Sequence, residues 1–451
     1  METIPVLPLD LIRPIRNIRT RTFFILDDRL DQDKLRNALS VLIRDHWRKL
    51  GARLVGKAKT GPLVYQVPKV FPKDYQLFRW TSKNNDFPID DVCPSLAPNP
   101  GLSEKEPSEV RMLPLTDSVD KLFRPSDWPL HLEDEVDAPL LLFHISLFTN
   151  STVLTISMTH ILGDQLGVAN ILRASLGLVN GVVPPPMLGY DDDILPGKKP
   201  FADYPKSKTY QKGKMHVRRP LEYLFVILPY IPELVLHPKE ESTVLLFPLS
   251  VIQSLRERHI KMLTEKDGTS PDEITNGDIL SAIMTKFSRM GNKKKTMLAL
   301  SQTVNLRGRI PELAEPEQSR GFIHNGQVYG IARFPFSHSV SIGEIAQRNR
   351  QGIKEILDPD AIEVQEAVRR EMQRRKQGTH VCEPFERSHG ISNWSPAWRD
   401  LDFSPALQDG AKEARDGKPL RLVVLGQGTE AKTPKRCKNF LSSREIKQQQ
   451  S

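Results

Sequence analysis

His160 and Asp164, a histidine followed by an aspartate at the fourth position, are the pair in this chain best suited to catalysis. The run 153–158 before them alternates like a buried strand, and residues 168–176 after them have helical spacing. A histidine between a strand and a helix is held rigidly yet can face a cleft, as a general base must. A structural histidine is the commoner interpretation of such a position, so the pair needs support from other motifs.

Two further groups of residues could take part in the same chemistry. Arg307 and Arg309 flank a glycine after the predicted strand 297–304, where they form either a solvated turn or a buried cation that neutralises a carboxylate. The hydroxyl of Ser392 and the indole N–H of Trp394 could donate hydrogen bonds to a developing oxyanion, although Trp394 alone is typical of core packing.

The elements that must position these residues alternate between strands and helices in both halves of the chain. Strands are predicted over residues 16–26, 63–67, 139–148, 152–158, 242–249, 297–304 and 328–334. Helices are predicted over residues 31–50, 168–176, 251–264, 275–290 and 341–356, and a loop over 78–103. The fold class is therefore α/β.

Shifts in composition divide the chain into four parts. We expect an N-terminal domain over 1–180, a Pro- and Gly-rich crossover over 181–241, a C-terminal domain over 242–425 and a tail over 426–451. The tail holds six basic residues against two acidic ones and has no apolar periodicity, so we expect it to be disordered.

The bulk properties exclude several classes of protein. The 451 residues carry a net charge of +9, but neither a basic face with interleaved aromatics nor a known nucleic-acid module is present, so no nucleic-acid partner is predicted. The basic run 293–295 is either a solvated turn or a guide for a small polyanion such as a nucleotide. The three cysteines lie far apart and predict neither disulfides nor a metal site, and with no secretory signal we expect a cytoplasmic protein.

One apolar stretch stands out, over residues 221–236, but Glu222, Pro229, Pro232 and Glu233 interrupt it. No part of the chain reaches 18 uninterrupted apolar residues, so no membrane span is predicted. We expect this stretch to be a buried element or part of an apolar acceptor pocket, with membrane association as the lesser alternative.

Taken in order, five motifs resemble those of the BAHD-type CoA-dependent acyltransferases, most closely their fungal, trichothecene O-acetyltransferase-like branch. They are H-x-x-x-D at 160–164, N-L-R-G-R-x-P at 305–311, F-x-H-N at 322–325, S-N-W at 392–394 and D-F at 402–403. The resemblance spans roughly residues 1–425 and implies two chloramphenicol-acetyltransferase-like domains, each a mixed sheet with flanking helices. A crossover loop would join them, with a solvent channel between them.

The resemblance also implies a role for each matching residue. His160 is the general base, and Asp164 orients its loop by pairing with Arg307 or, as second candidate, Arg309. Ser392 and Trp394 lie beside the catalytic centre. Asp402 begins a structural motif on the CoA side and is expected to share the structural ion pair with Arg307 and Arg309.

The reaction that follows is transfer of an acyl group from acyl-CoA to a hydroxyl of a small secondary metabolite. Acetyl-CoA is the expected co-substrate, although the residues that bind it are unknown, and no bound cofactor is expected. No cysteine or serine stands near His160 in a nucleophile signature, which favours direct transfer without a covalent acyl-enzyme. The family suggests a monomer.

The chain departs from the family pattern at several positions. Gln165 and His324 stand where the family has glycine, and residues 404–406 replace the G-W-G that follows D-F. These changes keep a second hypothesis open, a catalytically inactive member that serves as a binding or scaffold protein. A peptide-forming condensation domain shares the fold but uses H-H-x-x-x-D-G, and residue 159 here is threonine.

Overall fold

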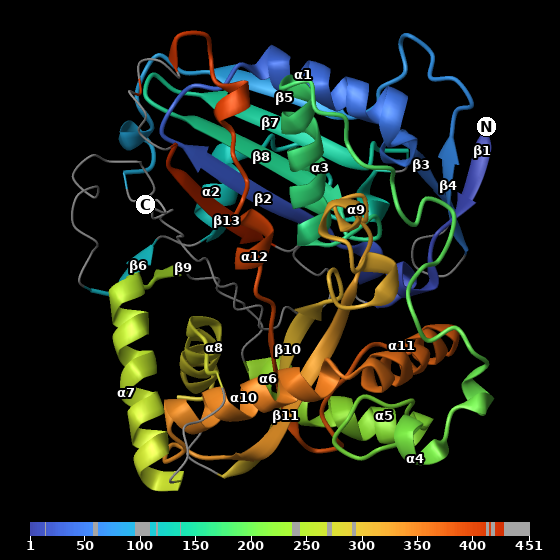
Figure 1. Ribbon diagram of the computed structural model, residues 1–451, viewed down its shortest axis with the longest axis vertical. Helices are drawn as coiled ribbons and strands as arrows, with labels where there is room; N and C mark the ends of the chain where they lie inside the picture. Colours follow the sequence, from blue (N-terminus) through green and yellow to red (C-terminus); the bar gives the residue numbers. More distant parts are fainter. Residues whose placement is uncertain are drawn as a thin grey trace.

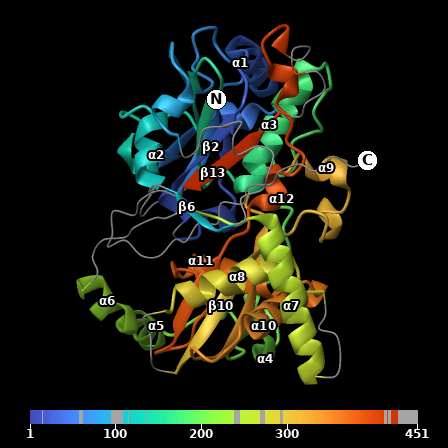
Figure 2. The same ribbon diagram turned by 90° about the vertical axis from the view of Figure 1, so that its left-hand side faces the viewer.

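The computed structural model describes residues 1–13, 15–56, 62–94, 109–113, 116–135, 137–236, 244–267, 273–290, 295–411, 415 and 420–427. The basic run at 293–295 and the tail predicted over 426–451 lie outside the described residues, apart from Lys295, Gly426 and Gln427. Two main sheets, each with its own helices, occupy the two ends of the molecule (Figure 1, Figure 2).

The first sheet has five strands and carries His160 at the end of its central strand. Its order is β13 (Leu422–Gln427), β2 (Arg19–Leu26), β8 (Thr152–Thr159), β7 (Leu141–Leu147) and β5 (Arg79–Asn84). The β5–β7 pair is parallel and the other pairs are antiparallel. All residues of β2 and β8 are buried, because helices α1 (Gln32–Val41) and α3 (Gln165–Val179) cover one face and α2 (Thr116–Phe123) the other.

The second sheet has three strands, in the order β11 (Gln327–Phe336), β10 (Thr296–Asn305) and β12 (Arg387–Ile391). Its two faces pack against different helices. Ala332 and Phe334 join a core with α7 (Leu249–Asp267), α8 (Asn276–Phe287) and α10 (Ile342–Ile356), while Ile331 faces α11 (Pro359–Arg374) and the crossover. This alternation along β11 follows from the two-residue period of a strand.

Two small sheets and five further α-helices complete the described part of the fold. A three-stranded sheet comprises β1 (Glu2–Pro5), β4 (Leu63–Val67) and β3 (Arg53–Gly56), and a two-stranded one pairs β6 (Arg111–Leu113) with β9 (Val244–Leu246). The remaining α-helices are α4 (Lys206–Thr209), α5 (Pro220–Ile227), α6 (Ile231–Leu236), α9 (Pro316–Ser319) and α12 (Ser395–Trp398). The β6–β9 pair brings the start of the second half against the first half.

The predicted extent of the C-terminal domain, 242–425, is wrong at its end. Strand β13 pairs with β2, with Val424 opposite Phe24, and Leu401 and Phe403 are buried in the core of the first sheet. Without β13 the buried strand β2 would form an open edge of the sheet, so this last segment completes the first layer. The other domain boundaries stay a proposal.

Two further expectations are corrected. The predicted loop over 78–103 contains β5, an edge strand whose half-exposed residues give little apolar alternation. The apolar stretch at 221–236 is largely exposed, although Val226 is buried: it forms short helices at the edge of the molecule, with Leu221 70% and Val235 71% exposed (Figure 2). Among the described residues, no helix combines the length and apolarity needed to cross a bilayer.

The return of the chain to the first sheet can be tested at Phe403, whose ring packs on that of Phe24 at a centroid distance of 5.5 Å. We expect Phe403→Ala to lower the free energy of unfolding in urea by about 3 to 5 kcal/mol, because it leaves a cavity in the main core. Phe287→Ala is the matched control, since Phe287 is 50% exposed, and it should change stability far less. Equal effects of the two substitutions would contradict this packing.

Candidate active site

His160 immediately follows β8, and its backbone is held on both sides. Its N–H donates to the carbonyl of Ile18 at 2.8 Å, and its carbonyl accepts the side-chain amide of Asn325, also at 2.8 Å. The next carbonyl, that of Ile161, accepts the hydroxyl of Tyr65 at 3.0 Å. The His160 side chain is half-buried, so the residue is fixed by the sheet and still accessible from one side.

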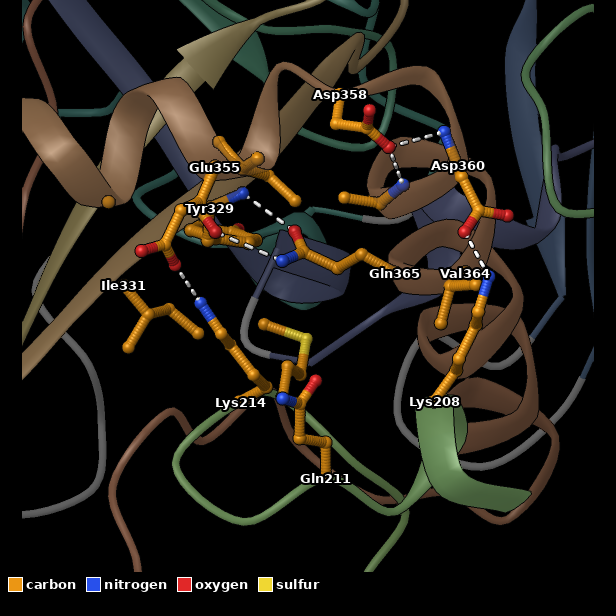
Figure 3. A pocket seen from close by; sticks show the side chains of 14 residues that line it. Lys208, Gln211, Lys214, Tyr329, Ile331, Glu355, Asp358, Asp360, Val364 and Gln365 are labelled. Atoms are coloured by element: carbon orange, nitrogen blue, oxygen red, sulfur yellow. Dashed lines mark hydrogen bonds and ion pairs between the residues drawn. The ribbon is translucent and has the colours of Figure 1, made fainter. Parts of the chain in front are cut away.

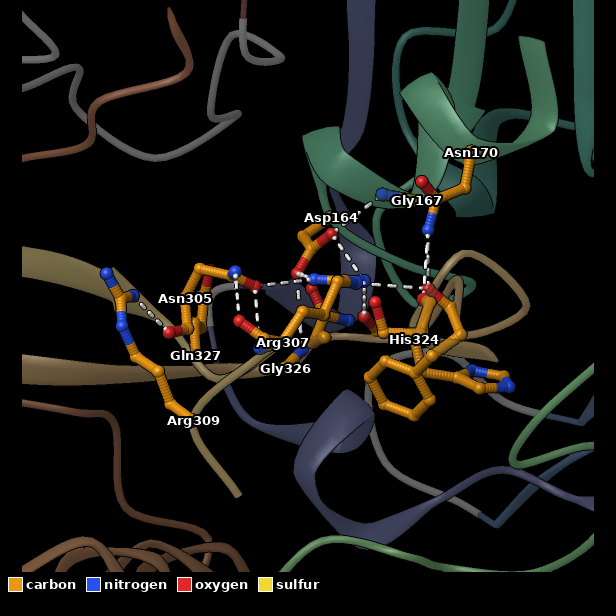
Figure 4. A network of polar contacts seen from close by, with 12 residues as sticks. Asp164, Gly167, Asn170, Asn305, Arg307, Arg309, His324, Gly326 and Gln327 are labelled. Atoms are coloured by element: carbon orange, nitrogen blue, oxygen red, sulfur yellow. Dashed lines mark hydrogen bonds and ion pairs between the residues drawn. The ribbon is translucent and has the colours of Figure 1, made fainter. Parts of the chain in front are cut away.

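Asp164 forms a two-pronged ion pair with Arg307, the first of the two predicted partners (Figure 4). Both contacts, from Nη1 to Oδ2 and from Nη2 to Oδ1, measure 3.0 Å, and both side chains are buried. The same carboxylate caps helix α3 by accepting the N–H of Gly167 at 2.9 Å. The aspartate is therefore structural: it ties the start of α3, in the first layer, to the end of β10, in the second.

Arg307 has further partners that hold the loop between β10 and β11. Its Nε donates to the carbonyl of Phe322 at 3.1 Å, its Nη2 donates to the carbonyl of His324 at 2.8 Å, and it lies over the Phe322 ring. These bonds compensate for removing the guanidinium from water. The loop 322–326 is thus fixed to the segment that carries His160.

The close approach of that loop explains the glycines around the motif. A Cβ atom on Gly163 or Gly167 would lie 1.9 or 2.0 Å from the carbonyl oxygen of Ile323, which is too close for any larger residue. Gln165, where the family has glycine, is buried and accepts a hydrogen bond from Thr22 at 2.9 Å. That departure is therefore accommodated without disturbing the loop.

His324, the second departure, lies in a buried polar cluster behind His160. Its Nε2 is 3.3 Å from Lys49 Nζ, and its Nδ1 is 3.4 Å from Asp10 Oδ2, a long electrostatic contact. Burial, and then the neighbouring Lys49, lower the pKa of His324, so the imidazole is neutral near pH 7. A neutral ring that accepts from Lys49 carries its proton on the nitrogen facing Asp10.

Lys49 is the cation of this cluster and is also fully buried. Its Nζ donates to the carbonyls of Gly189 at 3.2 Å and Tyr190 at 2.6 Å, and it lies over the Tyr65 ring. Burial lowers the pKa of Lys49 to about 8, while the nearby carboxylate of Asp10 partly opposes the shift.

Two residues predicted to share the ion pair do not. Arg309 donates to the carbonyl of Asn305, and Asp402 accepts from the hydroxyl and the N–H of Ser404. Neither forms an ion pair within the residues that the structure describes. Arg309 belongs to the turn after β10, and Asp402 lies just before a single turn of 3₁₀ helix, Ser404–Ala406, so each satisfies local polar groups instead.

The predicted oxyanion donors contact each other. The indole N–H of Trp394 donates to the hydroxyl oxygen of Ser392 at 2.8 Å, and Ser392 is exposed. The Trp394 ring lies against β13, where a Cβ on Gly426 would be 2.0 Å from a ring carbon. The indole N–H therefore donates to Ser392 and not to an oxyanion, whereas the hydroxyl of Ser392 can still donate its own proton to another acceptor.

Sequence reasoning missed three residues of this region, namely Asp10, Lys49 and Asn325. Asn325 stood inside the F-x-H-N motif, which marked it for attention without a role. Asp10 stands alone between apolar residues and Lys49 follows Arg48, and no local pattern identifies either of them as buried.

Two other features of the second half are distinct from this site. A cavity of about 330 Å³ lies between the crossover and helices α10 and α11, and its ion pairs join Lys208 to Asp360 and Lys214 to Glu355 (Figure 3). None of the candidate site residues lines this cavity.

His216, Glu222 and Glu383 lie close enough to hold a metal ion. However, Arg218 Nη1 donates to both carboxylates, at 2.5 and 3.4 Å, so a positive charge already occupies that position. The donor set therefore gives no reason to propose a metal there.

The ion pair between Asp164 and Arg307 predicts a large loss of stability in Asp164→Asn. The substitution leaves a buried guanidinium without its counter-charge, which should lower the free energy of unfolding by about 3 to 5 kcal/mol. The control is Asp360→Asn, which removes the carboxylate of the exposed pair with Lys208 and should change stability by less than about 1 kcal/mol. If urea unfolding shows equal stability for the two variants, the ion pair does not carry this role.

The lowered pKa of Lys49 predicts a pH-dependent stability. Between about pH 8, its folded pKa, and 10.5, its ordinary value, the unfolded chain binds more protons, so stability rises with pH. Below pH 8 both states are protonated and this dependence ends. Urea unfolding from pH 8 to 9.5 should therefore show an extra slope of up to about 1.4 kcal/mol per pH unit compared with Lys49→Met. Parallel profiles would contradict the shift.

No family model matches the amino-acid sequence of this chain, but several known proteins are similar to it in sequence. Acetyltransferase pyiB of Pyricularia grisea is 28% identical, over 95% of this chain and 86% of that protein. Acetyltransferase adrJ of Penicillium rubens is 27% identical, over 87% and 81%. A third relative, sdnM of Sordaria araneosa, is 27% identical, over 94% and 89%, and is named a transcriptional regulator.

Solved structures show the same fold at low sequence identity. F. sporotrichioides TRI101, crystallised with coenzyme A and T-2, superposes with a TM-score of 0.59 at 14% identity, covering 93% of this chain and 88% of that one. Vinorine synthase gives a TM-score of 0.51 at 15% identity, covering 90% and 82%. The predicted α/β fold is thus confirmed, and with the acetyltransferase relatives so is the resemblance of this chain to the fungal branch of the BAHD-type acyltransferases.

Proposed function

We propose that this protein is an acyl-CoA-dependent O-acyltransferase of secondary metabolism, with acetyl-CoA as its co-substrate. The observation that carries the proposal is the rigid placement of His160 beside the Asp164–Arg307 ion pair, in a chain that is similar to two proteins named acetyltransferases, pyiB and adrJ. The coenzyme A bound to TRI101, a protein of the same fold, supports acyl-CoA as the donor.

His160 is proposed as the general base of a direct transfer. An alcohol is a poor nucleophile toward a thioester, because its pKa is far above 7. His160 takes the proton from the acceptor hydroxyl as its oxygen attacks the thioester carbonyl. When the tetrahedral intermediate collapses, the carbon–sulfur bond breaks and His160 returns the proton to the departing CoA thiolate. The products are the ester and free CoA.

Ser392 is proposed as the donor to the oxyanion of that intermediate. Because its oxygen accepts the indole N–H of Trp394, its hydroxyl proton is directed away from the ring. A hydroxyl oriented in advance stabilises charge as it develops, without reorganising at the moment of reaction. Trp394 then acts through Ser392, by orienting it.

The acceptor is proposed to be a hydroxyl of a small metabolite, as the T-2 bound to TRI101 suggests by analogy. Terpenoid and polyketide hydroxyls are the first to test. A monomer in the cytoplasm is part of the same proposal.

A second candidate function is that of a catalytically inactive binding protein. The observation in its favour is that sdnM, which matches as much of the chain as the acetyltransferases do, is named a transcriptional regulator. Retention of His160 and of the ion pair beneath it favours the enzyme. The two hypotheses differ in whether the protein turns over a CoA thioester.

The experiment that decides between them measures thiol release from acetyl-CoA and longer acyl-CoAs against hydroxylated terpenoids and polyketides. We expect acceptor-dependent release by the wild type and a fall of about 10²- to 10⁴-fold in kcat in His160→Ala, the share that general base catalysis supplies. His338→Ala, at an exposed histidine, is the control and should keep full activity. If no pair of acyl-CoA and acceptor gives thiol release, and calorimetry detects no binding of CoA, the hypothesis of an enzyme is wrong and that of an inactive binding protein is favoured.

A further inference from the structure

Asn325 bridges the backbone of His160 to a buried carboxylate. Its side-chain nitrogen lies 2.8 Å from the carbonyl oxygen of His160 and 2.8 Å from Oδ1 of Asp10. Both partners are acceptors, so the two N–H bonds of one amide group serve them both, and this fixes which end of the amide faces them. Asn325 is fully buried, so water does not compete for either bond.

Asp10 in turn holds Asn325 in place. It lies in a single 3₁₀ turn, Pro8–Leu11, is 1% exposed, and also accepts the backbone N–H of Asn325 at 3.3 Å. Its other oxygen faces His324, and the charge of Lys49 lies behind that imidazole. The carboxylate is thus kept in the interior by two hydrogen bonds from Asn325 and by the nearby cation of Lys49.

We propose that Asn325, held by Asp10, is a positioning residue that sets the direction of the His160 imidazole. The inference rests on the proposed function, in which that imidazole is the base. The direction of the Cα–Cβ bond of a residue is determined by its two flanking peptide planes. For His160, Ile18 binds the N–H of the first plane, and Asn325 binds the carbonyl of the second.

Loss of the Asn325 amide therefore frees the second plane, and the imidazole can rotate out of line with the acceptor hydroxyl. Proton transfer in the transition state depends on that alignment, and a displacement of about 1 Å is enough to lower the rate by about 10²-fold. Binding of either substrate need not change, because Asn325 contacts the His160 backbone from within the protein.

The chain offers a matched pair of the same chemistry elsewhere. Asn349 donates its side-chain amide to Oδ1 of Asp278 at 2.9 Å, and both residues are buried, between α10 and α8 in the second half. Asn349→Ala removes an equivalent hydrogen bond from a buried asparagine without touching the segment of His160. It separates an effect on positioning from a general effect on stability.

The first experiment compares the steady-state kinetics of Asn325→Ala and Asn349→Ala. We expect kcat to fall about 10²-fold in Asn325→Ala, with the KM values for acetyl-CoA and acceptor within about twofold of wild type. Asn349→Ala should keep its kcat, although both variants lose thermal stability. Equal changes of kcat in the two variants, or a rise of KM at constant kcat in Asn325→Ala, would overturn the proposal.

A second readout needs no turnover and so separates this inference from the proposed function. Diethyl pyrocarbonate modifies accessible neutral histidines, and mass spectrometry of the peptide that contains His160 gives its rate. We expect a severalfold faster reaction in Asn325→Ala, and in Asn325→Ser if the alanine variant does not fold, but an unchanged rate in Asn349→Ala. An unchanged rate in the folded Asn325 variants would overturn the positioning role. A wild type without thiol release would instead overturn the proposed function alone.

Discussion

The ion pair between Asp164 and Arg307 is the interaction on which the arrangement of the site depends. It joins the start of α3, in the first layer, to the end of β10, in the second, and the loop 322–326 is then bound to the same guanidinium. An ion pair in the interior contributes little net stability, because desolvation opposes it. Its value here is geometric: two parallel hydrogen bonds define both the distance and the relative orientation of the two segments. The candidate base lies next to this joint, so the relative placement of the two layers determines the position of His160.

A second polar group, Asp10 with Lys49, His324 and Asn325, lies on the other side of the same loop. Its members come from the N-terminal turn, from the segment after α1 and from the β10–β11 connection. Because each polar atom needs a partner in the absence of water, these contacts allow few alternative arrangements. The interior behind His160 is thus specified by directional bonds, whereas the surrounding sheets are held by apolar packing that tolerates substitution.

The residues that were predicted from the sequence are marked by patterns in neighbouring residues. Those that were missed contact partners that are distant along the chain. The strand before His160 and the helix after Asp164 have local signals, and these predicted the elements. The partner of Asp164 was predicted from the resemblance to the BAHD-type acyltransferases. Asp10 and Lys49 bond to residues 315 and 275 positions away, respectively, and no local pattern encodes such contacts. The same limit explains why the segment after Trp394 was assigned to the C-terminal domain: no local pattern shows that Leu401, Phe403 and β13 pack with the first sheet. The exposed helices at 221–236 show the converse error, since apolar composition was taken to mean burial.

Strand β13 has a consequence for how the molecule forms. The strand that it pairs with, β2, is about 400 residues earlier in the chain, so the first sheet contains a contact of very long range along the sequence. During synthesis at roughly 5 to 20 residues per second, β2 is made long before β13, and its outer edge stays without that strand until the residues between them have emerged. For that interval the nascent protein presents an unpaired, apolar edge, which is the type of surface that chaperones bind and that associates between chains. The layer that carries His160 is begun before the second sheet is made and is completed only after it.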